Sequence, residues 1–250
     1  MLLQPLSSFH GPEIAQLQNG APAHFLTLSH WIEAKKFDLG LHAELVQELL
    51  MMPGEHEARK FSRRHTHCWR SDWQLIRPRT IALGVAYYCI EHGENDFFLD
   101  SIIKEVMRSG ASEPMAATWV KQGVWMARMP TVCILAELAV PIMNLNRRLR
   151  LISKRFEGGW SLVHWRGRHG NQFIHDYALN EGIPIRYVGK KDQRLVGNEV
   201  KLLHTSPDYF FVFDRKGQKR GERAVSEIRA AGKSVEVILW QAEQTNDLFI

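Results

Sequence analysis

The chain has 250 residues, of which 45% are hydrophobic and 24% are charged, and its formal net charge is +5. This composition excludes a disordered or fibrous chain and is typical of a globular protein with one large core or two smaller ones. No apolar run is long enough to cross a bilayer and no secretory segment opens the chain, so we expect a cytoplasmic protein with no membrane partner.

Positive charge is concentrated in the second half of the chain. From Arg147 onward there are nineteen Lys and Arg against twelve Asp and Glu, whereas the preceding residues hold thirteen against fifteen. An excess of this kind is one signature of a surface that binds phosphates. The alternative is a solvated basic face that serves only solubility.

The first clear helix is predicted over residues 28–37, after an N-terminal stretch of loops and short strands. His30, Glu33 and Phe37 follow at helical spacing and therefore share one face, with Ala34 beside them. This face either lines a pocket or enters an ordinary core. In the second case a backbone carbonyl would satisfy the ring of His30.

A second helix is predicted from Asp38, as its N-cap, to the stop at Pro53. Leu41, Leu45 and Leu49 recur at four-residue intervals along it and would form a buried stripe.

A third helix should start at the capping-box pattern of Ser71 and Gln74, whose side chains would bond the amides of the first turn. Pro78 removes one amide from this helix, so we expect a kink or break there. Further helices are predicted at Phe98–Arg108 and Thr131–Leu149.

From Trp160 onward, short apolar runs alternate with helical ones. Strands are predicted at Ser161–Trp165, Ile183–Val188, Tyr209–Phe213 and Val235–Leu239, and helices at Asn171–Glu181, Leu195–Thr205 and Glu222–Ala231. Gly182 and Gly232 lie where glycines commonly end helices. The alternation predicts a parallel α/β sheet with right-handed crossovers.

Cysteine and histidine spacing predicts neither a disulfide framework nor a metal site. Cys68, Cys89 and Cys133 are scattered, which favours a reducing compartment. Residues 65–68 read His-Thr-His-Cys, but no second cluster supplies the remaining ligand. We therefore expect no metal and no other cofactor.

Residues 28–37, Leu-Ser-His-Trp-Ile-Glu-Ala-Lys-Lys-Phe, resemble the Glu-His-Tyr-x-Gln-Ala-x-Lys-Phe signature of the NADAR family of N-glycosidases and ADP-ribose-related proteins. Residues 6–10, 52–63 and 71–73 resemble further segments of that family, so the resemblance covers about residues 1–110. It implies an N-glycosidase in which Glu33 is the acid or base and Lys36 steadies a phosphate or hydroxyl. The implied pocket residues are Phe9, His30, Trp31 and Trp73.

The sequence departs from the NADAR signature at Ser29, which stands where the family has an acid. A serine hydroxyl cannot stabilise an oxocarbenium-like centre by charge or act as a base near neutral pH. Glu33, in place of the family's Gln, would supply a carboxylate from a shifted position. The departure implies a fold that is kept while the chemistry is lost.

The segment from about residue 158 to 240 resembles the Rossmann-like SLOG family, which includes nucleotide-binding modules and a DNA-processing protein that binds single-stranded DNA. The resemblance rests on residues 162–171, 197–199 and 207–213. Trp165 and Arg166 occupy positions where a closely held mononucleotide would need glycine.

Basic residues and one tryptophan follow the ends of the expected parallel strands, which share one edge of an open sheet. This basic rim consists of Trp165, Arg166, Arg168, His169, Lys190, Lys191, Arg215, Lys216, Lys219 and Arg220. Charge with an aromatic platform suits an extended phosphate backbone.

The predicted fold is therefore a mainly helical, α+β NADAR-like domain over residues 1–150, followed by a small Rossmann-like SLOG-type α/β domain over 151–250. We expect a non-enzymatic nucleic-acid-binding accessory protein of phage or mobile-element origin, with single-stranded DNA as the expected nucleic acid. A replication or transcription enzyme is a possible protein partner. The alternatives are an N-glycosidase or ADP-ribose-processing enzyme and a sensor of a nucleotide signal.

Overall fold

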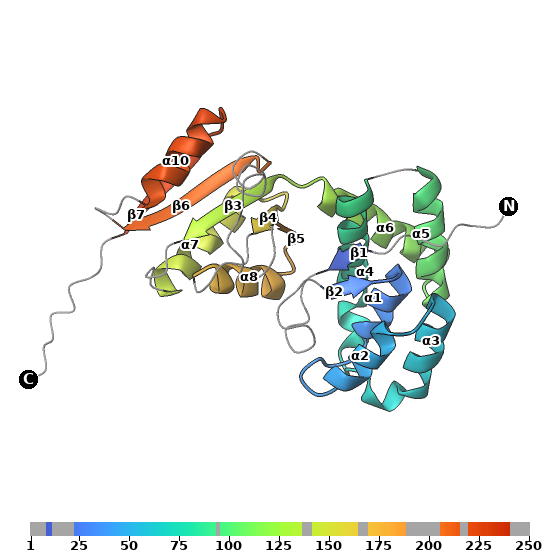
Figure 1. Cartoon of the computed structure of the whole chain (residues 1–250). Coiled ribbons are helices and arrows are strands. Elements are labelled where there is room, and N and C mark those ends of the chain that lie inside the picture. Colours follow the sequence, from blue (N-terminus) through green and yellow to red (C-terminus); the bar gives the residue numbers. More distant parts are fainter. Residues whose placement is uncertain are drawn as a thin grey trace, which may run out of the picture. The chain divides into compact units, whose positions relative to one another are not determined.

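The computed structural model describes residues 9–11, 23–93, 96–136, 142–164, 170–188, 206–215 and 220–240. The chain divides into two compact units, Met1–Met129 and Pro130–Ile250, and each is described by itself (Figure 1). The division falls about twenty residues before the expected boundary at 150, because residues 131–136 form a strand of the sheet in the second unit.

The first unit is built mainly from helices, with one small antiparallel strand pair. Its elements are β1 (Phe9–Gly11), β2 (Ala23–Phe25), α1 (Leu28–Ala34), α2 (Ala43–Leu50), α3 (Glu55–Arg64), the 3₁₀ turn η1 (Thr66–Cys68), α4 (Trp73–His92), α5 (Asp96–Arg108) and α6 (Glu113–Ala127). The long helix α4 packs along α6 and also contacts α1 and β1. Helix α6 is absent from the sequence-based prediction.

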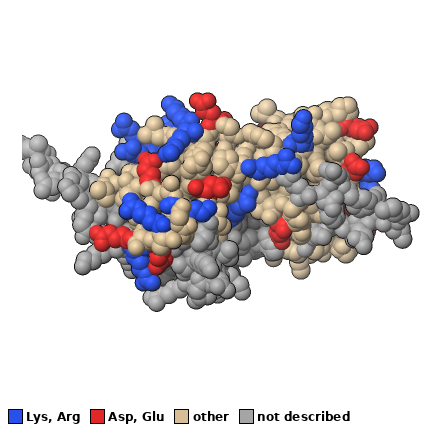
Figure 2. Space-filling model, turned by 90° about the horizontal axis from the view of Figure 1, so that it is seen from above, with Lys and Arg blue, Asp and Glu red and all other residues tan. Residues whose placement is uncertain are grey.

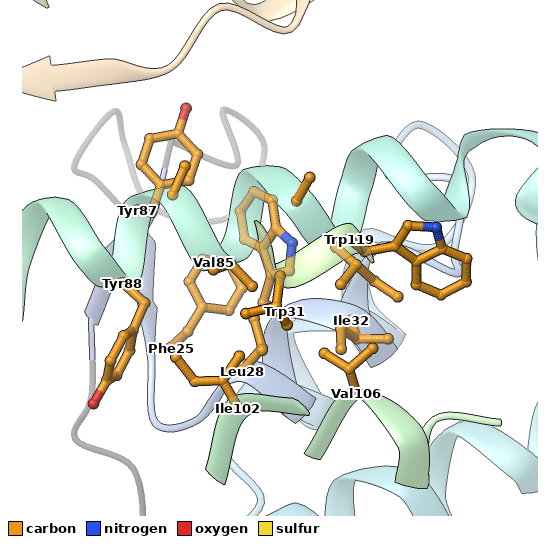
Figure 3. Close-up of a cluster of buried hydrophobic side chains, with 14 of the residues drawn as sticks. Phe25, Leu28, Trp31, Ile32, Val85, Tyr87, Tyr88, Ile102, Val106 and Trp119 are labelled. Carbon is orange, nitrogen blue, oxygen red and sulfur yellow. The ribbon is translucent and has the colours of Figure 1, made fainter. Parts of the chain in front are cut away.

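The core of the helical unit forms around Trp31, whose indole lies among side chains from β2, α4 and α6 (Figure 3). Phe25 meets the Trp31 ring edge-on at 5.1 Å between centroids, and Tyr87 packs against it at 5.6 Å. The indole Nε1 donates a 2.7 Å hydrogen bond to the carbonyl of Thr80. A large ring with its only donor satisfied is a stable core side chain.

The second helix is shorter than its leucine spacing predicted. Helix α2 begins after His42, because Asp38 instead accepts a 2.8 Å hydrogen bond from the amide of Gly40 in a tight turn. Leu49 is fully buried, whereas Leu41 precedes the helix and is 77% exposed. Only the C-terminal part of the expected stripe therefore enters the core.

The start of α4 also differs from the prediction. The N-cap is Asp72, which makes no capping bond with its side chain, so the expected capping box of Ser71 and Gln74 does not form. The carboxylate of Asp72 pairs with Arg70 instead, at 2.6 and 2.9 Å. A kink or break was expected at Pro78, and the helix runs through this residue without a break.

The second unit is an α/β unit around a five-stranded parallel sheet. Its elements are β3 (Thr131–Ala136), α7 (Ile142–Arg155), β4 (Ser161–His164), α8 (Gly170–Glu181), β5 (Ile185–Tyr187), β6 (Tyr209–Arg215), α10 (Arg220–Ala230) and β7 (Val235–Trp240). The strand order is β5-β4-β3-β6-β7. This is a doubly wound order, which reverses direction between β3 and β6.

Helices cover both faces of the sheet (Figure 1). Apolar residues of α7 and α8 pack on one face with Leu162 and Phe211, and residues of α10 pack on the other with Val163 and Phe210. Because alternate residues of a strand point to opposite faces, these buried strands need apolar residues at successive positions. This explains their continuous apolar runs.

Most of the predicted C-terminal elements are confirmed within a few residues. Gly182 and Gly232 have positive φ values of 61° and 73° and end α8 and α10, as expected. The main error is the helix predicted at Thr131–Leu149, where the structure has strand β3 and only then α7. The helix predicted at Leu195–Thr205 lies outside the described residues.

Candidate functional site

Helix α1 is buried on every side. All seven of its residues are buried, and Thr27 caps it by accepting a 3.4 Å hydrogen bond from the amide of His30 through its hydroxyl. The residues expected to line one face of a pocket therefore lie inside the helical unit. Polar side chains on such a helix must find partners within the protein.

His30 is a satisfied core histidine. Its Nε2 lies 3.0 Å from the carbonyl of Met52, and a carbonyl can only accept, so Nε2 carries the proton. Its Nδ1 lies 2.9 Å from the hydroxyl of Thr27, which then donates to it. Burial lowers the pKa of His30, although the Met52 carbonyl and nearby glutamates oppose this effect. The structure thus confirms the interpretation in which a backbone carbonyl holds the ring.

Glu33 and Lys36 form a buried ion pair. Lys36 Nζ donates a hydrogen bond to Glu33 Oε2 over 2.6 Å. Lys36 is only 6% exposed and Glu33 only 1%. The ammonium also lies 4.4 Å from the centre of the Trp69 ring. Desolvation lowers the pKa of Lys36, and the adjacent Glu33 carboxylate opposes that shift.

Two arginines extend the positive charge around this pair. The charges of Arg77 and Arg63 both lower the pKa of Lys36, after the larger effect of its burial. Arg77 is held by hydrogen bonds from Nη2 to the carbonyl and hydroxyl of Ser109, at 2.9 and 3.3 Å. Its guanidinium also stacks over Trp119 at 5.3 Å.

A carboxylate does lie beside Ser29, but it comes from a distant part of the chain. The amide of Ser29 donates to Glu105 Oε1 over 2.5 Å, and Arg59 donates to the Ser29 hydroxyl over 3.0 Å. Burial raises the pKa of Glu105, which is 3% exposed. Sequence analysis missed this residue; the signal was an acid on the apolar face shared by Ile102 and Val106.

The two tryptophans expected in the pocket are core side chains. Trp31 and Trp73 are 2% and 4% exposed and belong to the core, so neither ring face is open to a ligand. Phe9 is described only through its backbone, which pairs with Phe25 between β1 and β2. The pattern that predicted a pocket therefore marks a packed interior.

Most of the basic rim lies outside the described residues. This holds for Trp165, Arg166, Arg168, His169, Lys190, Lys191, Lys216 and Lys219. Arg215 is the last residue of β6 and Arg220 is the first of α10, both described only through their backbones.

The ends of the strands before these residues do lie at one edge of the sheet. All pairings are parallel, and His164 at the end of β4 is opposite Tyr187 at the end of β5. On the other side, Ala136 ends β3 opposite Phe213, two residues before β6 ends at Arg215.

The described surface carries charges of both signs. On the face drawn in Figure 2, Asp and Glu side chains are scattered among Lys and Arg side chains. Within the described ranges, no group of three or more His, Cys, Asp or Glu side chains is arranged to hold a metal ion. No helix in the same ranges combines the length and apolar character needed to cross a membrane.

The sequence matches no protein-family model and no curated protein.

Proposed function

We propose that this protein binds nucleic acid without cleaving it, with single-stranded DNA as the preferred form, through the basic rim at the carboxyl edge of its parallel sheet. The observation that carries this proposal is the orientation of the strands. Because β4, β5 and β6 are parallel and paired in register, the segments that follow them leave from the same edge. The ten rim residues occupy the ends of these strands, the segments that follow them and the first position of α10.

The topology of the sheet favours this edge as a binding site. Ligands of open α/β sheets bind outside the carboxyl ends of the strands, where the strand order reverses. Here the order reverses between β3 and β6, and β6 is followed by the basic stretch at 215–220. The distribution of charge agrees, because residues 130–250 hold nineteen Lys and Arg against thirteen Asp and Glu.

The proposal can be tested by fluorescence anisotropy of a labelled single-stranded oligonucleotide at several salt concentrations. Affinity should fall steeply with salt, with a slope of about −0.7 for each phosphate that is neutralised. The variant in which Lys190, Lys191, Lys216 and Lys219 are all changed to Glu should bind more weakly and with a flatter salt dependence.

A matched control separates a local site from general charge. The control variant changes four exposed cations of the helical unit, Lys60, Arg79, Lys104 and Lys121, to Glu and so makes the same change in net charge. It should retain most of the affinity. Equal loss in both variants, or no binding by the unmodified protein at low salt, would overturn the proposal.

A second candidate is an N-glycosidase or ADP-ribose-processing enzyme in the helical unit. It is favoured by one observation, the 2.6 Å approach of Glu33 and Lys36, the two residues to which that chemistry was assigned. However, Glu33 is 1% exposed and already pairs with Lys36, whereas a catalytic carboxylate must face its substrate. The geometry therefore favours the binding function.

The enzyme hypothesis and the sensor hypothesis predict different results when the protein is mixed with a nucleotide-derived ligand. An enzyme should hydrolyse ribosylated bases and lose that activity in Glu33→Gln. A sensor should bind ADP-ribose or NAD saturably and release no product. If neither hydrolysis nor binding is observed, both candidates fail while the nucleic-acid proposal stands.

A further inference from the structure

We propose that β7, the outer strand of the parallel sheet, is a dimerisation surface that pairs antiparallel with β7 of a second copy of this chain. Strand β7 lies at one end of the strand order and pairs through all six of its residues with β6 on its inner side. On its outer side it pairs with no strand of the described residues. The inference goes beyond the proposed function, because it needs neither the basic rim nor any cleavage chemistry.

The two lateral edges of this sheet are built differently. The opposite edge strand, β5, has only three residues, follows Pro184 and carries Arg186 at its centre. Short length, proline and charged residues are devices by which proteins keep an edge strand from pairing. Strand β7 has six residues without Pro, Lys or Arg, and its register with β6 is continuous. The backbone amides and carbonyls on its outer side are therefore a template for another strand.

The side chains of β7 on the face of α10 are apolar and incompletely covered. Val235, Val237 and Leu239 alternate along the strand and therefore share this face. Val235 packs at the margin of the core formed with α10, whereas Val237 is 36% exposed and Leu239 is 60% exposed. A strand added at the outer edge would remove apolar surface of these two side chains from water, which is favourable.

The sequence of β7 is complementary to itself. A two-fold axis through Val237, perpendicular to the sheet, places Val235 of one copy opposite Leu239 of the other and Val237 opposite its own counterpart. Because directly opposite side chains lie on the same face, the apolar residues of both copies form one continuous row. A register centred on Glu236 would put two carboxylates opposite each other. A register centred on Ile238 would leave Val235 with no opposite residue within the strand.

The charges of this strand also fit the pairing. Glu236 lies on the other face of β7, where its Oε2 accepts a 2.8 Å hydrogen bond from Arg155 of α7. In the proposed register Glu236 is opposite Ile238 of the second copy, so the two glutamates are not directly opposite each other. Each copy therefore brings its carboxylate together with its own counter-ion.

The test is sedimentation velocity of the full chain over a wide range of protein concentration, after nucleic acid has been removed. Removal is needed because two chains bound to one nucleic-acid strand would also sediment as a pair. The unmodified protein should approach twice the mass of one chain as its concentration rises. High salt should not dissociate this dimer, because salt screens exposed charges and the proposed contacts are apolar side chains and backbone hydrogen bonds.

The decisive variant is Val237→Lys, which places two like charges directly opposite each other at the two-fold axis. The dissociation constant of the dimer should rise at least about tenfold, because both copies also lose an apolar contact. Leu179→Lys is the matched control. Leu179 is 37% exposed, which is close to Val237, but it lies on α8, which contacts β3 and β4. This control should dimerise like the unmodified protein, and circular dichroism checks the fold of both variants.

Val237→Cys tests the register by a second route. The two α-carbons at the axis of an antiparallel pair lie about 4.5–5.5 Å apart, which is within the range of disulfides. Mild oxidation should therefore link two chains covalently, and a reducing agent should release them. Leu179→Cys and the unmodified protein, whose Cys89 and Cys133 are buried, serve as controls and should link far more slowly.

The interface is overturned by a monomer at every concentration, by equal dissociation of Val237→Lys and Leu179→Lys, or by equal cross-linking of Val237→Cys and Leu179→Cys. A monomer would leave the edge of β7 to a peptide of another protein or to a segment outside the described residues. The dimer and the nucleic-acid proposal fail independently, because Val237→Lys should bind the oligonucleotide no more weakly than the unmodified protein.

Discussion

The indole of Trp31 occupies the space that a side chain at Gly84 would need: a β-carbon there would lie 2.5 Å from Trp31 Cδ1. Helix α1 therefore approaches α4 at a position where α4 presents only backbone. The same carbon would lie 2.8 Å from the side chain of Leu28, so Trp31 and Leu28 together occupy the space beside Gly84. This contact lets a buried seven-residue helix pack closely against the twenty-residue helix α4.

Gly84→Ala should lower the free energy of unfolding by about 1–3 kcal/mol, the usual cost of forcing an extra carbon into a packed core. The measurement is chemical denaturation followed by tryptophan fluorescence. Gly158→Ala is the control, because no atom lies within 4 Å of the added carbon. A Gly84→Ala variant as stable as Gly158→Ala would show that α1 can shift away from α4 at little cost.

Removing one partner of the buried Glu33–Lys36 pair should destabilise the protein strongly. Lys36→Met leaves a carboxylate that is 1% exposed close to Arg77 but without its direct partner, and the expected cost is about 3–5 kcal/mol. The double variant Glu33→Gln with Lys36→Met should lose less unfolding free energy than the sum of the losses in the two single variants. Denaturation of all four proteins gives the coupling energy directly.

A surface pair provides the reference for this cycle. Arg223 and Glu227 are 2.9 Å apart in α10, but the arginine side chain is 85% exposed. Arg223→Gln should therefore change stability by less than about 1 kcal/mol. If Lys36→Met lowers the free energy of unfolding no more than Arg223→Gln does, the buried Glu33–Lys36 pair is not formed in solution.

Lys35 should make stability depend on pH in the alkaline range. Burial, with a smaller contribution from the charge of Arg70, lowers the pKa of Lys35 from 10.5 to about 8. Between these two pH values the unfolded chain holds a proton that the folded chain has lost, so the contribution of Lys35 to stability rises with pH. Below about pH 8 the cost of holding this partly buried charge is constant.

Lys35→Met should consequently be more stable than the unmodified protein at pH 7, with an advantage that shrinks as the pH approaches 10.5. Thermal melts at several pH values measure the difference between the two proteins. Lys60→Met, at an exposed position of α3, should show a difference that does not vary with pH. A constant difference for Lys35→Met as well would mean that its ammonium is hydrated in the folded protein.

The sequence was a good guide where one local pattern decides the structure. The buried strands of the second unit read as apolar runs, and the glycines at 182 and 232 end their helices because only glycine adopts their positive φ values easily. Prediction failed where distant contacts decide. Residues 131–136 are an apolar run that fits a strand as well as the start of a buried helix, and their pairing with β4 on one side and β6 on the other decides between the two.

The same limit applies to the candidate site. The helical spacing of His30 and Glu33 correctly placed them on α1, but their residue types could not show that every side of that helix is covered. Glu105 reaches Ser29 across 76 residues of sequence, and Trp69 lies against Lys36 only because the chain folds back beside the end of α1. Such clusters depend on tertiary structure and leave only faint signals, such as an acid within an apolar stripe.

The side chain of Asp208 should stabilise the start of the sheet. Its Oδ2 accepts hydrogen bonds from both the amide and the hydroxyl of Thr131, each over 2.7 Å, and its own amide donates to the Thr131 carbonyl over 2.9 Å. These bonds join the beginnings of β3 and β6, the two strands between which the order reverses. Asp208→Ala leaves the amide of the buried Thr131 without its acceptor, at a cost of about 1–3 kcal/mol.

Asp208→Asn distinguishes the loss of charge from the loss of the acceptor. The amide oxygen of Asn can still accept from Thr131, so this variant should be intermediate in stability between the unmodified protein and Asp208→Ala. Glu157→Ala, at an exposed turn of the same unit, is the control and should be near neutral. Denaturant unfolding ranks the four proteins. If Asp208→Ala unfolds like Glu157→Ala, backbone pairing alone holds β3 and β6 together, and the carboxylate is dispensable for the fold.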